Sequence, residues 1–155
     1  MKKGAKGPEN YGKYKLQGTK PYYDYVKTDK AKQNAADVLT ALQNEENVCL
    51  VGLWAYNPPA ILSAVRQEGK LGKVKIVAFD EMDDTLRGIE AEEIFATVVQ
   101  QPYKFGYESV KMMAHLIKGD QSLVPANKIL YIPHRVIRRD NVVEFTAELR
   151  KLRGK

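Results

Sequence analysis

From residue 29 onward, hydrophobic and polar residues follow two patterns that alternate along the chain. Apolar residues three or four positions apart, which is the spacing of one helical face, predict helices. These segments are residues 31–42, 60–69, 82–90, 103–119 and 141–152. Short, nearly continuous apolar runs between them predict strands. These runs are residues 48–53, 73–79, 94–100 and 128–137, with residues 13–19 as one further candidate.

Strands that alternate with crossover helices predict an α/β fold, a Rossmann-like parallel sheet layered by helices on both faces. The run at residues 48–53 is apolar throughout, so we expect a strand covered on both sides, with Cys49 buried in it. Pro133 lies inside the last predicted strand and indicates an edge strand or a bulge. Asn141 is expected to cap the final helix.

Composition supports one domain. The chain has 155 residues, 44% of them hydrophobic, and a net charge of +6. The basic residues collect at the two ends, without a stripe of bases and exposed aromatics, so we expect solvated ends and no nucleic-acid partner. We divide the chain into a basic, flexible segment (residues 1–12) and a domain (residues 13–155).

The charged start lacks the apolar region of a signal peptide, and no stretch of about 18 apolar residues predicts a membrane span.

Ligands of open parallel sheets bind beyond the carboxyl ends of the strands. The residues there are Trp54, Tyr56 and Asn57 after the first strand, Asp80 after the second and Gln100 after the third. A ring, a carboxylate and an amide suit a neutral, polyhydroxylated ligand. Each residue also has a structural alternative: Asp80 as a helix N-cap, Trp54 as core, and Gln100 as the brace of a loop.

An enzymatic alternative starts from the acidic residues Asp80, Asp83 and Asp84, which could hold Mg²⁺ for phosphoryl chemistry. The haloacid-dehalogenase-like pattern needs an aspartate where Met82 stands, and no G-x-x-x-x-G-K-[ST] loop occurs. No G-x-S-x-G elbow is present, and the two histidines lack partners at ligand spacing. We expect His115 to face solvent or to lie at the boundary between the buried and exposed sides of its helix. We therefore expect no enzyme, no cofactor and no metal.

Several of these segments resemble one known family. The pieces that carry the resemblance are KIVAFDE (residues 75–81), TVVQQPYKFGYESV (residues 97–110) and VIRRDNVVEF (residues 136–145). They are similar in order and spacing to the carboxyl-terminal portion of ribose-type (type I) periplasmic sugar-binding proteins of ABC transporters. The resemblance extends from about residue 14 to residue 152.

The resemblance implies a set of sugar-binding positions. These are Asp80 at the end of its strand, Gln100 before Gln-Pro, and Trp54 by place, with Tyr56 and Asn57 beside it. The turn in PYYDYVKTD also holds a contact residue in this family, and either Asp24 or Tyr25 takes that role. A monosaccharide ligand, a membrane permease as partner and a periplasmic location follow from the same resemblance.

The chain departs from the family in what it lacks. Family members have two lobes that close on the sugar, and their second lobe has the strand order 2-1-3-4-5. The amino-terminal lobe and the first strand–helix unit of the second lobe have no counterpart here. The helix at residues 103–119 would normally pack on the missing lobe. We therefore expect an incomplete lobe, part of a truncated product or completed by another chain such as a second copy. The effector-binding part of a lactose-repressor-like regulator is an alternative, although no DNA-binding head is present.

Overall fold

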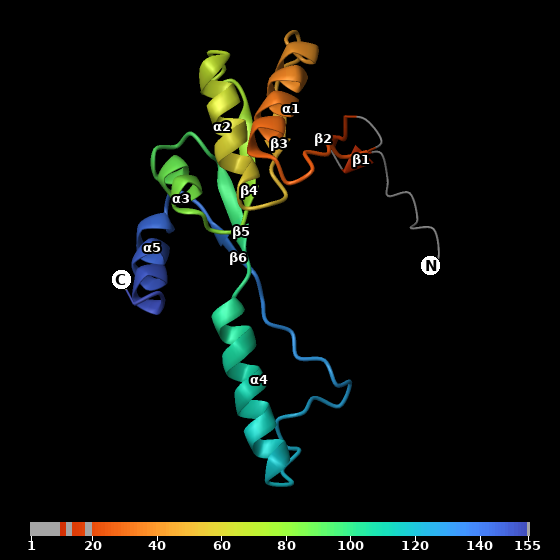
Figure 1. The fold of residues 1–155 in the computed structure, drawn as a ribbon, viewed down its shortest axis with the longest axis vertical. Coiled ribbons are helices and arrows are strands. Elements are labelled where there is room, and N and C mark those ends of the chain that lie inside the picture. Colours follow the sequence, from red (N-terminus) through yellow and green to blue (C-terminus); the bar gives the residue numbers. More distant parts are fainter. Residues whose placement is uncertain (1–9, 12–13, 18–19, 155) are drawn as a thin grey trace.

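The computed structural model describes residues 10–11, 14–17 and 20–154, and a four-stranded sheet lies at its centre. Its strands, in spatial order, are β3 (Cys49–Val51), β4 (Lys75–Phe79), β5 (Ala96–Val99) and β6 (Arg135–Ile137). The helices are α1 (Thr28–Ala41), α2 (Asn57–Gln67), α3 (Asp83–Glu90), α4 (Pro102–Ile117) and α5 (Val142–Leu152). The predicted α/β fold is confirmed, because each predicted helix is present and the strands alternate with helices (Figure 1).

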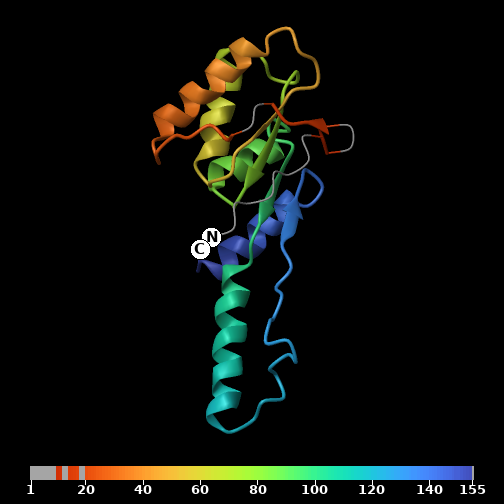
Figure 2. The ribbon, with the colours of Figure 1, turned by 90° about the vertical axis from the view of Figure 1, so that its right-hand side faces the viewer.

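One strand runs against the predicted direction. Strands β3, β4 and β5 are parallel, but β6 pairs antiparallel with β5, with Thr97 opposite Ile137. Helix α4 leads away from the sheet, and an extended return segment (residues 118–134) runs back beside it (Figure 2). Because this segment enters the sheet directly as β6, β6 runs opposite to β5. Only Arg135–Ile137 of the predicted strand pairs with the sheet, because the partner strand β5 ends at Val99, opposite Arg135. The predicted edge position is confirmed, since β6 ends the sheet.

The helices of the described part that pack on the sheet cover one face, so the prediction of helices on both faces is wrong. The strand register puts Ile76, Ala78, Val99 and Ile137 on the same face, and all four are fully buried in one cluster with α2, α3 and α5. Each buried isoleucine or valine among them contributes about 1.5–3 kcal/mol. This cluster is the core of the fold.

The other face of the sheet is open at β3. Cys49 and Val51, whose side chains point away from the helices, are exposed, and Val51 keeps 51% of its surface. Cys49 was predicted to be buried, and that prediction is wrong. The apolar run suggested cover on both faces, but β3 is the edge strand of the described sheet and helices lie on one side of it only.

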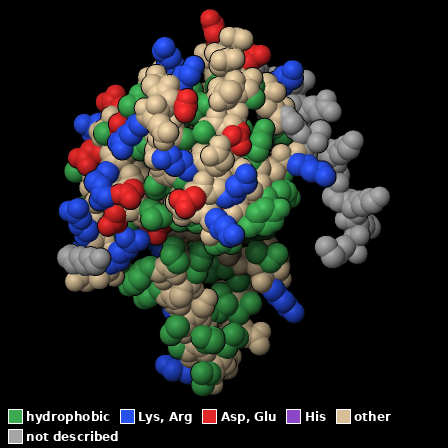
Figure 3. Space-filling model, turned by 45° about the horizontal axis from the view of Figure 1, so that its top comes forward, with side chains coloured by type: hydrophobic (Ala, Val, Ile, Leu, Met, Phe, Trp, Pro, Cys, Tyr) green, Lys and Arg blue, Asp and Glu red, His purple; other side chains and the backbone are tan. Residues whose placement is uncertain are grey.

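Helix α4 leaves the body of the molecule and runs away from the sheet (Figures 1 and 2). None of its residues is buried, and large apolar side chains along it are exposed. These are Tyr103, Phe105, Tyr107, Val110, Met113, Leu116 and Ile117. Hydrophobic side chains gather on this projecting part with a few Lys or Arg side chains, whereas most charged side chains in this view lie over the body (Figure 3). Of the helices in the described ranges, none combines the length and the hydrophobicity needed to cross a lipid bilayer.

The amino-terminal segment is described only in part. The candidate strand at residues 13–19 contains β2 (Tyr14–Lys15), which pairs antiparallel with β1 (Asn10–Tyr11) and does not join the main sheet. Residues 13 and 18–19 of that candidate, and residues 1–9 and 12 of the predicted basic segment, lie outside the described residues. The predicted boundary at residue 12 therefore stays a prediction.

Candidate functional site

The carboxyl ends of three parallel strands meet at one edge of the sheet. Val51 of β3 is opposite Val77, and Phe79 of β4 is opposite Val98 of β5. Neighbouring strands lie roughly 4.8 Å apart. The residues that follow these strands, in the loops before α2, α3 and α4, therefore share this edge, as predicted.

Asp80 occupies a left-handed backbone conformation directly after β4, with φ of +66°. Its backbone is fixed on both sides: its N–H donates to the Val98 carbonyl at 3.0 Å, and its carbonyl accepts from Thr97 Oγ1 at 2.7 Å. The N-cap position of α3 belongs to Met82, so the capping alternative for Asp80 is wrong. Within the described residues, the half-buried carboxylate of Asp80 forms no hydrogen bond or ion pair.

Trp54 lies in the turn between β3 and α2, and 66% of its surface is exposed. The core alternative for Trp54 is therefore wrong. Asn57 closes this turn twice: its N–H donates to the Trp54 carbonyl, and its side-chain Oδ1 accepts from the Trp54 N–H, both at 2.9 Å. Gly52 enters the turn without room for a side chain, because a Cβ there would lie 2.9 Å from the ring of Pro58. Close packing between strand end and helix start thus sets the position of the turn.

Asp24 joins the same part of the molecule from 32 residues upstream. Its Oδ1 accepts from the Tyr56 hydroxyl at 2.7 Å and from the Val26 N–H at 2.9 Å, and its Oδ2 accepts from Asn57 Nδ2 at 2.7 Å. The hydrogen bond from Tyr56 is the main reason why the pKa of Asp24 is lowered, and the same bond raises the pKa of Tyr56. Tyr25, the other residue considered for this turn, is 78% exposed. The structure brings Asp24, and not Tyr25, together with Tyr56 and Asn57.

Gln100 follows β5 and its side chain is exposed. The brace of the loop is its neighbour: Gln101 Nε2 donates to the Pro133 carbonyl at 2.5 Å, which links the start of α4 to the return segment. This role was an alternative for Gln100, whereas Gln101 was not among the predicted residues.

A second carboxylate beside Asp80 was also missed. Glu81 is half-buried, and burial is the main cause that raises the pKa of its carboxyl group, against the opposing effect of Arg153. Arg153, at the end of α5, lies 3.4 Å from Glu81 and 3.3 Å from Asp83. These two ion pairs connect the carboxyl end of the chain to the start of α3. Arg153 is 72 residues from Glu81, so no local pattern could have predicted the contact.

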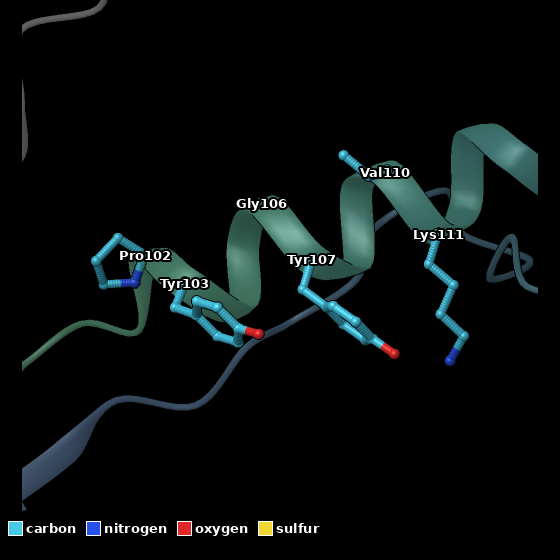
Figure 4. A pocket seen from close by; sticks show the side chains of 6 residues that line it. All are labelled: Pro102, Tyr103, Gly106, Tyr107, Val110 and Lys111. Atoms are coloured by element: carbon cyan, nitrogen blue, oxygen red, sulfur yellow. The ribbon is translucent and has the colours of Figure 1, made fainter. Parts of the chain in front are cut away.

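A shallow hollow also runs along α4, lined by Pro102, Tyr103, Gly106, Tyr107, Val110 and Lys111 (Figure 4). The rings of Tyr103 and Tyr107 stack at 6.4 Å between centroids, and Lys111 points to the same side (Figure 4). This hollow is open, because all of its lining residues belong to α4. The strand ends bring together an aromatic ring, a carboxylate and an amide from three loops, whereas the hollow is lined by residues of one helix.

The described residues contain no group of three or more His, Cys, Asp or Glu that could hold a metal ion. His115 is half-buried, as expected for a boundary position, and its Nδ1 lies 2.6 Å from Asp120. At the strand ends, an exposed indole, a carboxylate without a partner among the described residues and an exposed amide can stack on a ring and exchange hydrogen bonds with hydroxyl groups.

The comparisons with known proteins agree with the fold. A family model described as a periplasmic binding protein domain matches residues 1–121. The glucose-galactose binding protein GanP from Geobacillus stearothermophilus is 27% identical with a TM-score of 0.63, over 76% of this chain and 40% of GanP. The arabinose binding protein AraP from the same organism is 26% identical with a TM-score of 0.64, over 76% and 41%.

A solute binding protein of an ABC transporter from Agrobacterium vitis, solved with bound D-fucose, shares the fold. It is 24% identical with a TM-score of 0.67, over 83% of this chain and 42% of that protein. The chain thus spans about two fifths of the length of these structures. No curated protein sequence matches it.

Proposed function

Because this chain belongs to the periplasmic binding protein domain family, we propose that it forms part of one lobe of a sugar-binding protein. A monosaccharide would lie against the carboxyl edge of β3, β4 and β5. The observation that carries the proposal is Asp80: its backbone is fixed in a left-handed conformation, and its carboxylate has no partner among the described residues. A carboxylate left free in this way can accept hydrogen bonds from two hydroxyl groups of one ligand.

Trp54 and Gln100 complete the proposed contact surface. The exposed indole of Trp54 covers the apolar face of a sugar ring, and the amide of Gln100 both donates and accepts hydrogen bonds. The names of GanP and AraP support a sugar as ligand, since those proteins bind glucose or galactose and arabinose.

We place the protein outside the cytoplasmic membrane, as its family name implies, and propose the permease of a sugar ABC transporter as its partner. The matched structures are solute-binding proteins, which supports a binding role without catalysis. The site offers the ligand a single wall. The other wall would come from a second lobe, in the same protein or in another chain.

Calorimetry against pentoses, hexoses and deoxysugars tests this proposal. One wall provides only part of the hydrogen bonds of a closed cleft, so we expect dissociation constants of roughly 1 mM or weaker, where 1 mM corresponds to about −4 kcal/mol. Micromolar binding by the monomeric chain would contradict the idea of a single wall. Equal heats with Trp54→Ala and with the unchanged chain would contradict the contact surface.

A further inference from the structure

We propose that Asp24 is a positioning residue, which holds the loop that presents Trp54 instead of contacting the sugar itself. This inference rests on the proposed function, because it assigns a task within the same site. It separates the residues at the strand ends into those that face the ligand and those that fix the loop.

The carboxylate of Asp24 is already occupied by protein donors. Three donors reach its two oxygens at 2.7–2.9 Å: the Tyr56 hydroxyl, Asn57 Nδ2 and the Val26 N–H. Asn57 is equally engaged, because its Oδ1 accepts from the Trp54 N–H, and the residue is only 8% exposed. Both side chains serve contacts within the protein. In contrast, the indole of Trp54 is 66% exposed.

These hydrogen bonds form an unbroken path to Trp54. Asp24 binds Asn57, and Asn57 closes the turn at Trp54 through its side chain and its backbone. The Tyr56 hydroxyl gives a second link between Asp24 and the same turn. Loss of the carboxylate therefore removes two of the attachments that hold this turn.

The backbone around Asp24 is strained, which indicates that the carboxylate holds it. Tyr25 and Val26 both have positive φ, +54° and +61°, and the Lys27 N–H donates to the Asp24 carbonyl at 3.0 Å. Two left-handed residues in the middle of a turn normally require Gly, Asn or Asp, and a β-branched valine is disfavoured there. Such strain persists only where the surroundings impose it. Here the bond from the Val26 N–H to the Asp24 side chain provides that constraint.

Asp24→Asn is the sharpest variant. An asparagine must place its NH₂ group either against Asn57 Nδ2 or against the Val26 N–H. Each orientation therefore brings two hydrogen-bond donors face to face, with no acceptor between them. Asp37→Asn is the matched control, because it makes the same change on the exposed face of α1, where Gln33, at 2.7 Å, is the only donor to Asp37 among the described residues.

The readout is Trp54, the single tryptophan of the chain. The chain is labelled with 5-fluorotryptophan, and its one ¹⁹F resonance is recorded without sugar, together with the urea midpoint of each variant. We expect a shifted or broadened resonance in Asp24→Asn and an unchanged one in Asp37→Asn. Tyr56→Phe, which removes a single hydroxyl, should shift the resonance in the same direction by less, and it replaces Asp24→Asn if that variant does not fold.

A lowered urea midpoint with an unchanged ¹⁹F resonance would overturn the proposal, since Asp24 would then stabilise the fold without positioning Trp54. The sample contains no sugar, so the outcome is independent of the proposed function. A failure of every sugar to bind would reject that function and leave the positioning of Trp54 intact.

Discussion

Replacing Asp80 by asparagine separates binding from stability at the strand ends. Asparagine keeps the shape of the side chain and removes the negative charge that would accept hydrogen bonds from two hydroxyl groups. It also tolerates the left-handed φ of +66° that Asp80 adopts. The hydrogen bonds to Thr97 Oγ1 and the Val98 carbonyl involve only the backbone of residue 80, so they are retained. We therefore expect the urea midpoint of unfolding to change little.

Binding should respond strongly. A hydrogen bond to a charged group contributes about 1.5–3 kcal/mol, and about 1.4 kcal/mol corresponds to a tenfold change in affinity, so the dissociation constant should rise at least about tenfold. Ligand-observed NMR titration measures this even for weak binding. Asp83→Asn, which removes an exposed carboxylate three residues later, is the control and should leave the affinity unchanged. Unchanged binding together with a large loss of stability in Asp80→Asn would refute the assignment.

Three further outcomes are expected. Gly52→Ala should destabilise the chain by about 1–3 kcal/mol in urea unfolding, because the new Cβ would meet the Pro58 ring at 2.9 Å, and a midpoint equal to that of the unchanged chain would exclude this clash. Hydrogen bonds lower the pKa of Asp120 from 3.8 to about 2, so the contribution of its carboxylate to stability is present above pH 3.8 and is lost as the pH falls toward 2. An acid titration followed by circular dichroism should show this loss of stability in the unchanged chain and not in Asp120→Asn. The exposed apolar face of α4 should drive concentration-dependent self-association in sedimentation velocity, and Ile117→Lys should weaken it; a monomer at all concentrations would contradict this.

The elements of this fold were predictable because local patterns determine them. Apolar spacing located each helix, and the apolar runs located the strands, although the paired parts are shorter than the runs. Pro133 correctly indicated an edge strand. The antiparallel direction of β6 was not predictable in this way, because it depends on the path of the return segment beside α4.

The site was predictable only at the level of which strand ends meet. The rule for parallel sheets brought Trp54, Asp80 and Gln100 to one edge. Asp80 was predicted either to bind the ligand or to cap α3, and the start of α3 at Asp83 excludes the capping role. Apolar spacing in a sequence does not locate a helix start to within two residues, so it could not decide between these roles. The links from Asp24 to Asn57 and from Arg153 to Glu81 join residues 33 and 72 positions apart, and only the folded chain reveals them. Burial of Cys49 was predicted wrongly for a similar reason, since the sequence of a strand does not say whether both faces are covered.

The proposed function requires a neutral sugar to bind at the carboxyl edge of β3, β4 and β5. The most direct measurement is a sugar titration followed by ¹H–¹⁵N correlation spectra of the labelled chain. We expect saturable shifts for the amides of Trp54, Asp80 and Gln100 and for the indole N–H of Trp54. No shift with any sugar of the panel, or shifts confined to the hollow of α4 around Tyr103 and Tyr107, would contradict it.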